Sequence, residues 1–448
     1  MRFDREKTIH QFDTRLVLFG PMLLFKLFCD LGYWGLVSWN STVYQFNFNP
    51  VKFAVGLVCC VVLYFGIDHK RRKASTFLLY LFFLMQIIPI TTIYALGNDD
   101  TVYYLSLIFT TLMCEIIVRV LDSDTRFGRQ KTLSALLIVA FAALTVYTVV
   151  EMVRLYGRPS STALNIYSVY EMRASAPTLG KLLNYLLRWT MAVFLPLWTA
   201  KSIVEKKYLW TALLCGIMML VYLYTGQKTY LFAIPMVLGC TFWAKRDECY
   251  RELFFCFCIG FCILTFGCFF ESNRDTGLFN QIYSLIGRRC MLDTANTKFK
   301  YFNYFSNYPK MGFYGIFPRW LIKIDSYYEN VPYTYEIARI YYGAPSMNAN
   351  TGFLAEGFMR FGHFGTVVIM LLFSLMLKLI DRFAERAGYP LAIGVFAYRV
   401  FALADSHLID TLFFGEWLFL LLLLLFYSGE KKQKQGQERV FLLSPEQK

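Results

Sequence analysis

The chain has 448 residues, of which 57% are hydrophobic and 19% are aromatic. This composition excludes both an ordinary soluble globular protein and a disordered chain, and it indicates an integral membrane protein. The net charge of +14 does not indicate nucleic-acid binding, because Lys and Arg fall in short clusters between apolar stretches rather than along one basic face.

In chain order, the apolar stretches have the length of roughly 20 residues that a helix needs to cross a bilayer. They predict about 12 transmembrane helices, because the stretches are too long and too uniformly apolar for barrel strands. The first one follows a charged segment without a small-residue cleavage site, so we expect an anchored span and not a removed signal peptide. The predicted spans lie near residues 16–39, 51–67, 76–97, 101–119, 132–153, 183–203, 209–225, 229–244, 251–270, 364–380, 389–404 and 411–427.

Basic residues gather in every second connection, and the positive-inside rule places these connections in the cytoplasm. They include residues 70–73, Lys206 and Lys207, and the tail from Lys431. The short connections on the opposite side contain only one basic residue, Lys228. We therefore expect both termini in the cytoplasm.

This orientation divides the chain into four parts. Residues 1–270 are expected to form the first nine spans, with a smaller outer loop at 156–181. Residues 271–363 form one large polar segment outside the membrane, and residues 364–428 form the last three spans. Residues 429–448 are a cytoplasmic tail.

Charged residues inside spans are costly in lipid and commonly mark a function. Glu115 and Arg119 are one helical turn apart near the end of a span. We expect them to pair with one another.

The large outer segment contains more Lys and Arg than Asp and Glu, and topology does not account for this because long loops cross the membrane largely regardless of charge. Arg288 and Arg289 follow an amphipathic stretch at 278–286 and precede a run of aromatic residues at 301–308. The planar guanidinium group of arginine can donate two hydrogen bonds to the oxygens of one phosphate, and aromatic side chains stack on sugar rings. The alternative is an aromatic belt at the membrane surface.

Two further basic residues are expected on the outer side of the membrane. Arg173 is the strong anion ligand at the centre of the smaller outer loop, and Lys228 lies in the tight turn TGQKT between two spans. Both could reach an anion bound at the outer surface. The alternative is that each is an ordinary solvated side chain.

The stretch 346–365, SMNANTGFLAEGFMRFGHFG, is the most patterned in the chain. Its Asn and Thr residues are typical of a helix start, and its glycines allow close packing where the chain re-enters the membrane. Glu356 and Arg360 are four residues apart, which favours a helical ion pair. A helix start at the membrane surface is also suited to binding an anion.

Asp405, His407, Asp410 and Glu416 cluster around another outer turn. A solvated turn explains most of this cluster, but His407 and Glu416 are candidate acid or base groups. Of the 12 cysteines, most lie in spans as small hydrophobic residues. No Cys or His spacing indicates zinc, so we expect no metal, no cofactor and no disulfide framework.

The chain resembles the Wzy-type polymerases that assemble bacterial O-antigen and capsule from oligosaccharide repeat units. The resemblance rests on the layout of spans with a dominant outer loop late in the chain. Locally it rests on the turn TGQKTYL and on NANTGFLAEGFMRFGHFG.

The resemblance implies an all-α polytopic membrane protein of the lipid-sugar-dependent glycosyltransferase type in the bacterial inner membrane. Its substrates would be oligosaccharides on undecaprenyl pyrophosphate, and a flippase and a chain-length regulator would be its partners, with no nucleic acid. Arg173 and Arg288 fill the positions at which the family places pyrophosphate-binding arginines, with Arg289, Lys228 and Arg360 in support. Glu356 and His407 are the candidates for the base that activates the acceptor hydroxyl.

Three other readings remain open from the sequence. An O-antigen ligase would share the architecture, but a histidine is expected in its large outer loop, and here only His363 lies near that loop, at its edge. A transporter or lipid-oligosaccharide flippase would show internal repeats, and none is evident. A multispanning acyltransferase would need a histidine-centred motif in a span, which has no clear equivalent among four histidines.

Overall fold

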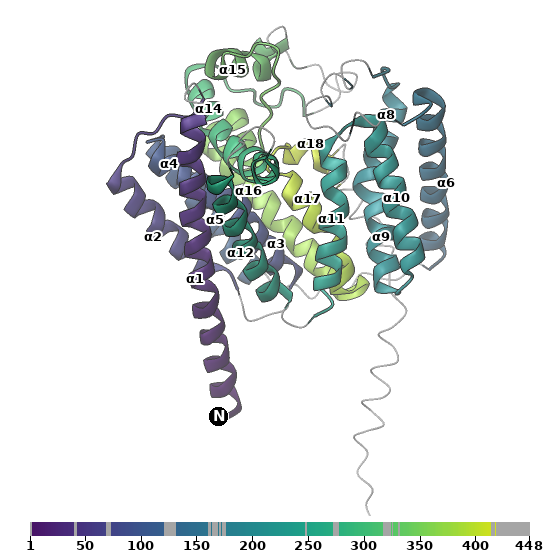
Figure 1. The fold of residues 1–448 in the computed structure, drawn as a ribbon, viewed down its shortest axis with the longest axis horizontal. Coiled ribbons are helices and arrows are strands. Elements are labelled where there is room, and N and C mark those ends of the chain that lie inside the picture. The colour runs from purple at the N-terminus through teal and green to yellow at the C-terminus, as the bar shows by residue number, and fades with distance from the viewer. Residues whose placement is uncertain are drawn as a thin grey trace, which may run out of the picture. The chain divides into compact units, whose positions relative to one another are not determined.

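The computed structural model describes residues 2–417 except for 40–42, 69–72, 121–130, 160–162, 164–168, 170–171, 173–175, 247–248, 272–276, 317–323, 325, 330–331 and 414–416. The described chain is helical and contains no strand in these ranges. Its helices (Figure 1) fall into two compact units. Unit 1 comprises residues 1–122, 242–378 and 396–414, and unit 2 comprises 123–241, 379–395 and 415–448.

Unit 1 contains the helices α1 to α5 and most helices from α12 onwards. Their bounds are α1 (Arg2–Trp39), α2 (Pro50–Gly66), α3 (Ala74–Phe82), α4 (Ile88–Leu96), α5 (Thr101–Val120), α12 (Cys249–Phe270), α13 (Leu278–Tyr283), α14 (Asp293–Asn307), α15 (Tyr333–Tyr342) and α18 (Leu408–Phe413). Three helices are divided between the units: α16 (Phe353–Ala387), α17 (Tyr389–Ala402) and α11 (Lys228–Trp243), of which the last two residues belong to unit 1.

Unit 2 is built from α6 (Lys131–Tyr156), α8 (Lys181–Trp189), α9 (Leu195–Val204), α10 (Tyr208–Thr225) and α11 (Lys228–Trp243). A π-helical turn, η3 (Thr190–Phe194), joins α8 to α9, and a similar turn, η1 (Phe83–Ile87), joins α3 to α4 in unit 1. Each turn ends two residues before a proline, Pro196 or Pro89. Proline has no N–H to donate to the carbonyl oxygen four residues earlier. A wider π-helical turn before the proline accommodates this missing hydrogen bond, and the helix remains continuous.

Seven helices are long and apolar enough to cross a membrane, by length and composition, among the described residues. They are Leu16–Ser38, Ala74–Leu96, Thr101–Val120, Ile138–Tyr156, Tyr208–Thr225, Arg251–Phe270 and Phe353–Ala387. Helices also occupy the other predicted spans as far as 389–404, while most of 411–427 lies outside the described residues. The architecture is that of a helical membrane protein.

The α3–η1–α4 rod is the core of unit 1, because every residue of its apolar stretch is buried. Its neighbour α1 carries a buried ion pair between Lys26 and Asp30, and both side chains bond to the Thr92 hydroxyl of α4. This pair was not predicted from the sequence, although two opposite charges four residues apart in an apolar stretch are a signal for it.

The expected pair between Glu115 and Arg119 is absent. Glu115 is buried, its Oε2 atom has no hydrogen-bond partner, and Arg119 is exposed. The carboxylate lies so close to Gly66 that any side chain at that position would collide with it. The expectation was wrong because adjacent charges on one helix can face different environments when one face is buried and the other is not.

Candidate functional site

The large polar segment forms one end of unit 1. Figure 1 shows α14 and α15 at the end remote from the start of α1. The predicted amphipathic stretch at 278–286 is helical, as α13 followed by the π-helical segment η4 (Ser284–Leu292), and it continues directly into α14. Since α12 ends at Phe270, this rod begins a few residues after the membrane helix.

A break in α16 shapes this end of the unit. Phe361 and Gly362 have non-helical backbone angles, and Gly362 has φ +65° with ψ −149°, a conformation that favours glycine. A Cβ atom on Gly357 would lie 2.7 Å from the carbonyl oxygen of Gly365. Gly357 and Gly365 thus let the short amino-terminal part of α16 pack against the longer part. This is the point where the sequence predicts that the chain re-enters the membrane.

Glu356 lies on the short part of α16 and is fully buried, with 0% of its surface exposed. Its Oε1 atom accepts a hydrogen bond of 3.1 Å from Nε of Arg360. Its Oε2 atom accepts bonds from the backbone N–H groups of Leu408, at 2.7 Å, and of Ile409, at 3.3 Å. The carboxylate therefore caps the first turn of α18, and both of its oxygens are engaged within the protein.

Arg360 completes this arrangement from the other side. It is 3% exposed, and its NH1 atom donates to the carbonyl oxygens of Tyr314 (2.8 Å) and Gly312 (3.4 Å). The backbone N–H groups of Met311 and Gly312 in turn donate to the carbonyls of Met359 and Arg360. The ion pair expected from the sequence is present, and it ties a turn of the polar segment to α16 and α18.

The connection between α17 and α18, residues 403–407, is held by several elements. Lys298 of α14 is 0% exposed, and its Nζ atom donates to the carbonyl oxygens of Thr294 (3.1 Å) and Ala404 (3.3 Å). Phe353 donates its N–H to Leu403. A Cβ atom on Gly352 would overlap the carbonyl oxygens of Leu403 and Ala404, so this approach requires glycine.

This connection carries His407 and Asp405, and Asp410 follows in the first turn of α18. The Nδ1 atom of His407 lies 3.4 Å from Oδ2 of Asp410. Burial alone would lower the pKa of His407, but the hydrogen bond with Asp410 and the charge of Glu356 outweigh it and raise this pKa above its ordinary value. The half-buried imidazole is thus oriented by a carboxylate, as the base in many hydrolases and transferases is.

Asp405 and two residues of α14 share one electrostatic environment. Asp405 has an exposed surface, but protein atoms surround its carboxylate, and the resulting loss of hydration raises its pKa. The positive charges of Lys298, His407 and Arg289 act in the opposite direction and lower this pKa. Burial lowers the pKa of Lys298 to about 7, and burial together with the charge of Asp405 raises the pKa of Asp293 to about 7. Perturbed groups concentrated in one place are typical of functional sites.

Arg288 and Arg289, the adjacent arginines of the polar segment, lie on η4. Arg288 is half-buried, and Ser284 accepts two hydrogen bonds from it, 3.1 Å from Nε and 2.8 Å from NH2. Arg289 is exposed and close enough to Asp405 to affect its ionisation. The structure therefore joins Arg289, His407, Glu356 and Arg360 in one region of unit 1.

Two further predicted ligands are Lys228 and Arg173. Lys228 is the first residue of α11 and belongs to unit 2. Arg173 lies outside the described residues, as does Glu416 of the predicted outer turn.

Asp293 and Lys298 were not predicted as site residues from the sequence. A signal was present, because Thr294, Lys298, Tyr301 and Phe305 recur at helical spacing on the buried face of α14. The described residues contain no group of three or more His, Cys, Asp or Glu side chains that could hold a metal ion.

Comparisons with protein-family models, with curated proteins and with solved structures find no match to this chain.

Proposed function

We propose that the protein is a polymerase of the Wzy type, a glycosyltransferase that joins oligosaccharide repeat units carried on undecaprenyl pyrophosphate into O-antigen or capsule. The observation that carries the proposal is the connection 403–407, in which His407 is oriented by Asp410. Lys298 bonds to this connection at Ala404, and Glu356 caps the helix α18 that follows it directly. A rigidly supported base beside exposed arginine suits group transfer from a pyrophosphate carrier.

In the proposed reaction, neutral His407 accepts the proton of an acceptor hydroxyl. The hydroxyl oxygen forms a bond to the anomeric carbon of the donor glycan, and the bond from that carbon to the lipid pyrophosphate breaks. Arg288 and Arg289 neutralise the departing pyrophosphate, and the resemblance to the Wzy-type family assigns the same role to Arg173 and Lys228. Metal ions are not required for this assignment, since the arginine forks supply the positive charge.

Within this scheme, Glu356 and Arg360 position the site and do not touch the substrate. Both side chains are almost completely buried, and their polar atoms bond to α18 and to the turn at 312–314. His407 is therefore the stronger of the two base candidates, because it is the one that retains partial exposure.

The proposed topology has twelve spans, both termini in the cytoplasm of a bacterium and the polar segment outside the inner membrane. A cysteine at Tyr308, which is 39% exposed, should react with a membrane-impermeant maleimide in intact spheroplasts. A cysteine at Lys206, in an exposed turn of the predicted cytoplasmic side, should react only after the membrane is ruptured. The reverse pattern would overturn the topology.

Replacement of Arg288 or Arg173 by Ala tests the pyrophosphate assignment in cells. Gel display of surface glycan should show single repeat units in place of long chains. The matched control is Arg339→Ala, because Arg339 is an exposed arginine of the same segment, paired with Glu336. Wild-type chain length in both variants would contradict the assignment.

A further inference from the structure

Tyrosines gather where α14, α15 and the short helix η5 (Tyr327–Glu329) meet in the polar segment of unit 1. Burial, with smaller contributions from Tyr327, Tyr308, Glu336 and Tyr341, raises the pKa of Tyr304 to about 12. Charges act on one another in this way only over short distances, so these hydroxyl groups lie close together. We call Tyr304, Tyr308, Tyr327 and Tyr341 the tyrosine face.

Two rings of the tyrosine face are exposed, and each rests on a buried ring. Tyr308 is 39% exposed and stacks on the buried Tyr304, with 4.3 Å between the ring centroids and an angle of 17° between the planes. Tyr327 is 53% exposed, and its ring meets that of the buried Tyr328 edge-on at 5.2 Å. The hydroxyl of Tyr328 donates to the carbonyl oxygen of Pro309. Rings supported in this way are preorganised, so a ligand that stacks on them loses little conformational entropy.

The polar groups of the tyrosine face are phenol hydroxyls, which both donate and accept hydrogen bonds. The carboxylate near Tyr304, that of Glu336, is paired with Arg339 at 2.7 Å. The face thus combines flat apolar rings with hydroxyl groups at their rims. A sugar residue has the matching chemistry, because its ring has apolar C–H faces and its edge carries hydroxyl groups.

An aromatic belt at the membrane surface is the alternative for such tyrosines. Neither α15 nor η5 belongs to the described helices that are long and apolar enough to cross a membrane. The exposed polar residues Ser306 and Asn307 directly precede Tyr308. Figure 1 shows α15 farther than α14 from the start of α1. These positions favour a polar ligand over the lipid surface.

Tyr333 connects the tyrosine face to the candidate site. Its ring lies against that of Tyr328, with 5.8 Å between the centroids. It is also close enough to Arg360 and Asp410 for both to affect its ionisation, and Asp410 orients His407. A chain molecule with one end at His407 can therefore extend toward the tyrosine face.

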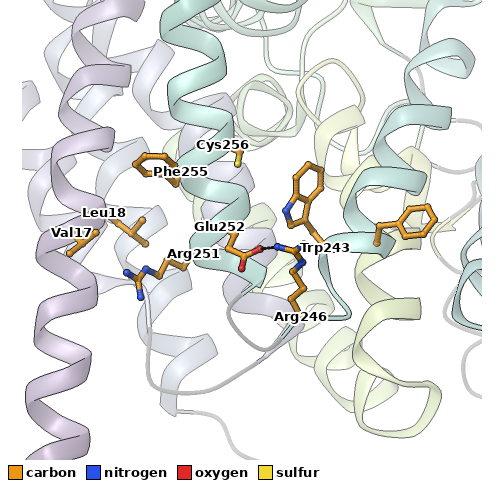
Figure 2. Close-up of a pocket in the computed structure, with 9 residues that line it drawn as sticks. Val17, Leu18, Trp243, Arg246, Arg251, Glu252, Phe255 and Cys256 are labelled. Atoms are coloured by element: carbon orange, nitrogen blue, oxygen red, sulfur yellow. Dashed lines mark hydrogen bonds and ion pairs between the residues drawn. The ribbon is translucent and has the colours of Figure 1, made fainter.

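A groove near the other end of α12 is the alternative place for a ligand in unit 1. It has a volume of about 910 Å³, and its lining includes Trp243, Phe255 and the ion pair of Arg246 with Glu252 (Figure 2). None of the described residues that line it carries a hydroxyl group. The apolar stretch of α12 has 20 residues, which corresponds to about 30 Å at a rise of 1.5 Å per residue. The groove therefore lies far from the polar segment and lacks the groups that bind sugars.

We propose that the tyrosine face binds a glycan chain, with sugar rings stacked on Tyr308 and Tyr327 and sugar hydroxyls bonded to the phenol hydroxyls. The inference rests on the proposed function for the identity of this glycan, which is then the growing chain behind the end that reacts at His407. Because the face holds sugars away from the reacting end, its contribution to binding grows with the length of the chain.

The test is a saturation-transfer NMR titration of the full-length protein in detergent. The probes are lipid-free oligosaccharides of one and of several repeat units, released by mild acid from the surface polysaccharide of cells that contain the protein. Tyr308→Ala and Tyr327→Ala should each weaken binding of the longer probe several-fold, up to about tenfold, because each removes a stacking contact. Binding of the single unit should change less.

Two further variants serve as controls. Tyr308→Trp should retain binding of the longer probe, since an indole also stacks on a sugar ring. Tyr185→Ala should bind as the wild type does, because Tyr185 is 47% exposed but lies on α8, outside the polar segment.

The outcomes separate this inference from the proposed function. Unchanged binding of the longer probe by both alanine variants, as a membrane belt would give, would overturn the inference, and so would a wild type that binds neither probe. If Tyr308→Ala folds poorly, Tyr327→Ala decides, because its ring is the more exposed of the two. Deletion of the gene without any change in the surface glycan would contradict the proposed function, while weaker binding by the variants would still support a glycan site.

Discussion

The carboxylate of Glu356 accepts a 2.7 Å hydrogen bond from the backbone N–H of Leu408, 52 residues further along the chain. The same side chain holds Arg360 at 3.1 Å. This contact fixes the start of α18, and with it the positions of His407 and Asp410, relative to the broken helix α16. The site is thus positioned by a buried charge pair and by caps, and not by the exposed residues that would meet a substrate.

Replacement of Glu356 by Ala should lower the free energy of unfolding by about 3–5 kcal/mol, because Arg360 would remain buried without its counter-charge. Thermal unfolding of the detergent-solubilised protein measures this. The matched control is Glu336→Ala, which removes an exposed ion pair with Arg339 and should cost less than about 1 kcal/mol. Equal losses in the two variants would show that the Glu356 contacts contribute no more than a surface pair.

Gly352→Ala should displace the connection that carries His407. The added Cβ would lie 2.5 Å from the Leu403 carbonyl oxygen, and overpacking of this kind costs about 1–3 kcal/mol. We expect polymer synthesis to fall by more than the loss of folded protein explains. Gly260→Ala is the control, because a Cβ at that helical position meets no atom within 4 Å. Normal polymer from Gly352→Ala would argue against a precise position for this connection.

Asp410→Asn should shift the pH dependence of the proposed transfer. The bond with Asp410 raises the pKa of His407, so its removal lowers that pKa. Since the base acts in its neutral form, the acidic limb of the rate profile should move to lower pH. The measurement is the rate of polymerisation in reconstituted vesicles against pH, and an unmoved acidic limb would exclude His407 as the base.

Lys298→Met should change how stability depends on pH. The folded-state pKa of Lys298 is about 7 against an ordinary value of 10.5, so between these values the unfolded chain binds more protons than the folded one. The stability of the wild type should therefore rise as the pH increases from about 7 to 10.5, and it should do so less in the variant. Lys181→Met, at the exposed start of α8, should retain the wild-type slope. Identical slopes in all three proteins would contradict a buried, neutralised lysine.

Much of the fold follows from the sequence because apolar length and helical periodicity are local properties. The helices α10, α11 and α12 begin and end within two residues of the predicted spans 209–225, 229–244 and 251–270. Close packing at the glycines where the polar segment meets the next span was also predicted, and Gly357 and Gly365 do approach closely. The break in α16 at Phe361 and Gly362 was not predicted. The number of membrane crossings and their direction stay predictions.

The site was less predictable, because its contacts join residues that are far apart in the sequence. Glu356 and Arg360 were identified as a pair, but their bonds to Leu408 and Tyr314 depend on tertiary packing. Lys298 was not identified, because its neighbours in the sequence are polar and aromatic and its burial arises from contact with Ala404, 106 residues away. Burial of a charge is a property of the fold, and a local pattern shows it only through helical spacing.

The polymerase activity is tested most directly with the purified protein in vesicles that contain oligosaccharide repeat units on undecaprenyl pyrophosphate. We expect lipid-linked glycans of two or more units, together with release of undecaprenyl pyrophosphate, and we expect His407→Ala to abolish both. Vesicles that move single lipid-linked units across the bilayer without lengthening them, or that transfer the glycan only to a different acceptor, would contradict it.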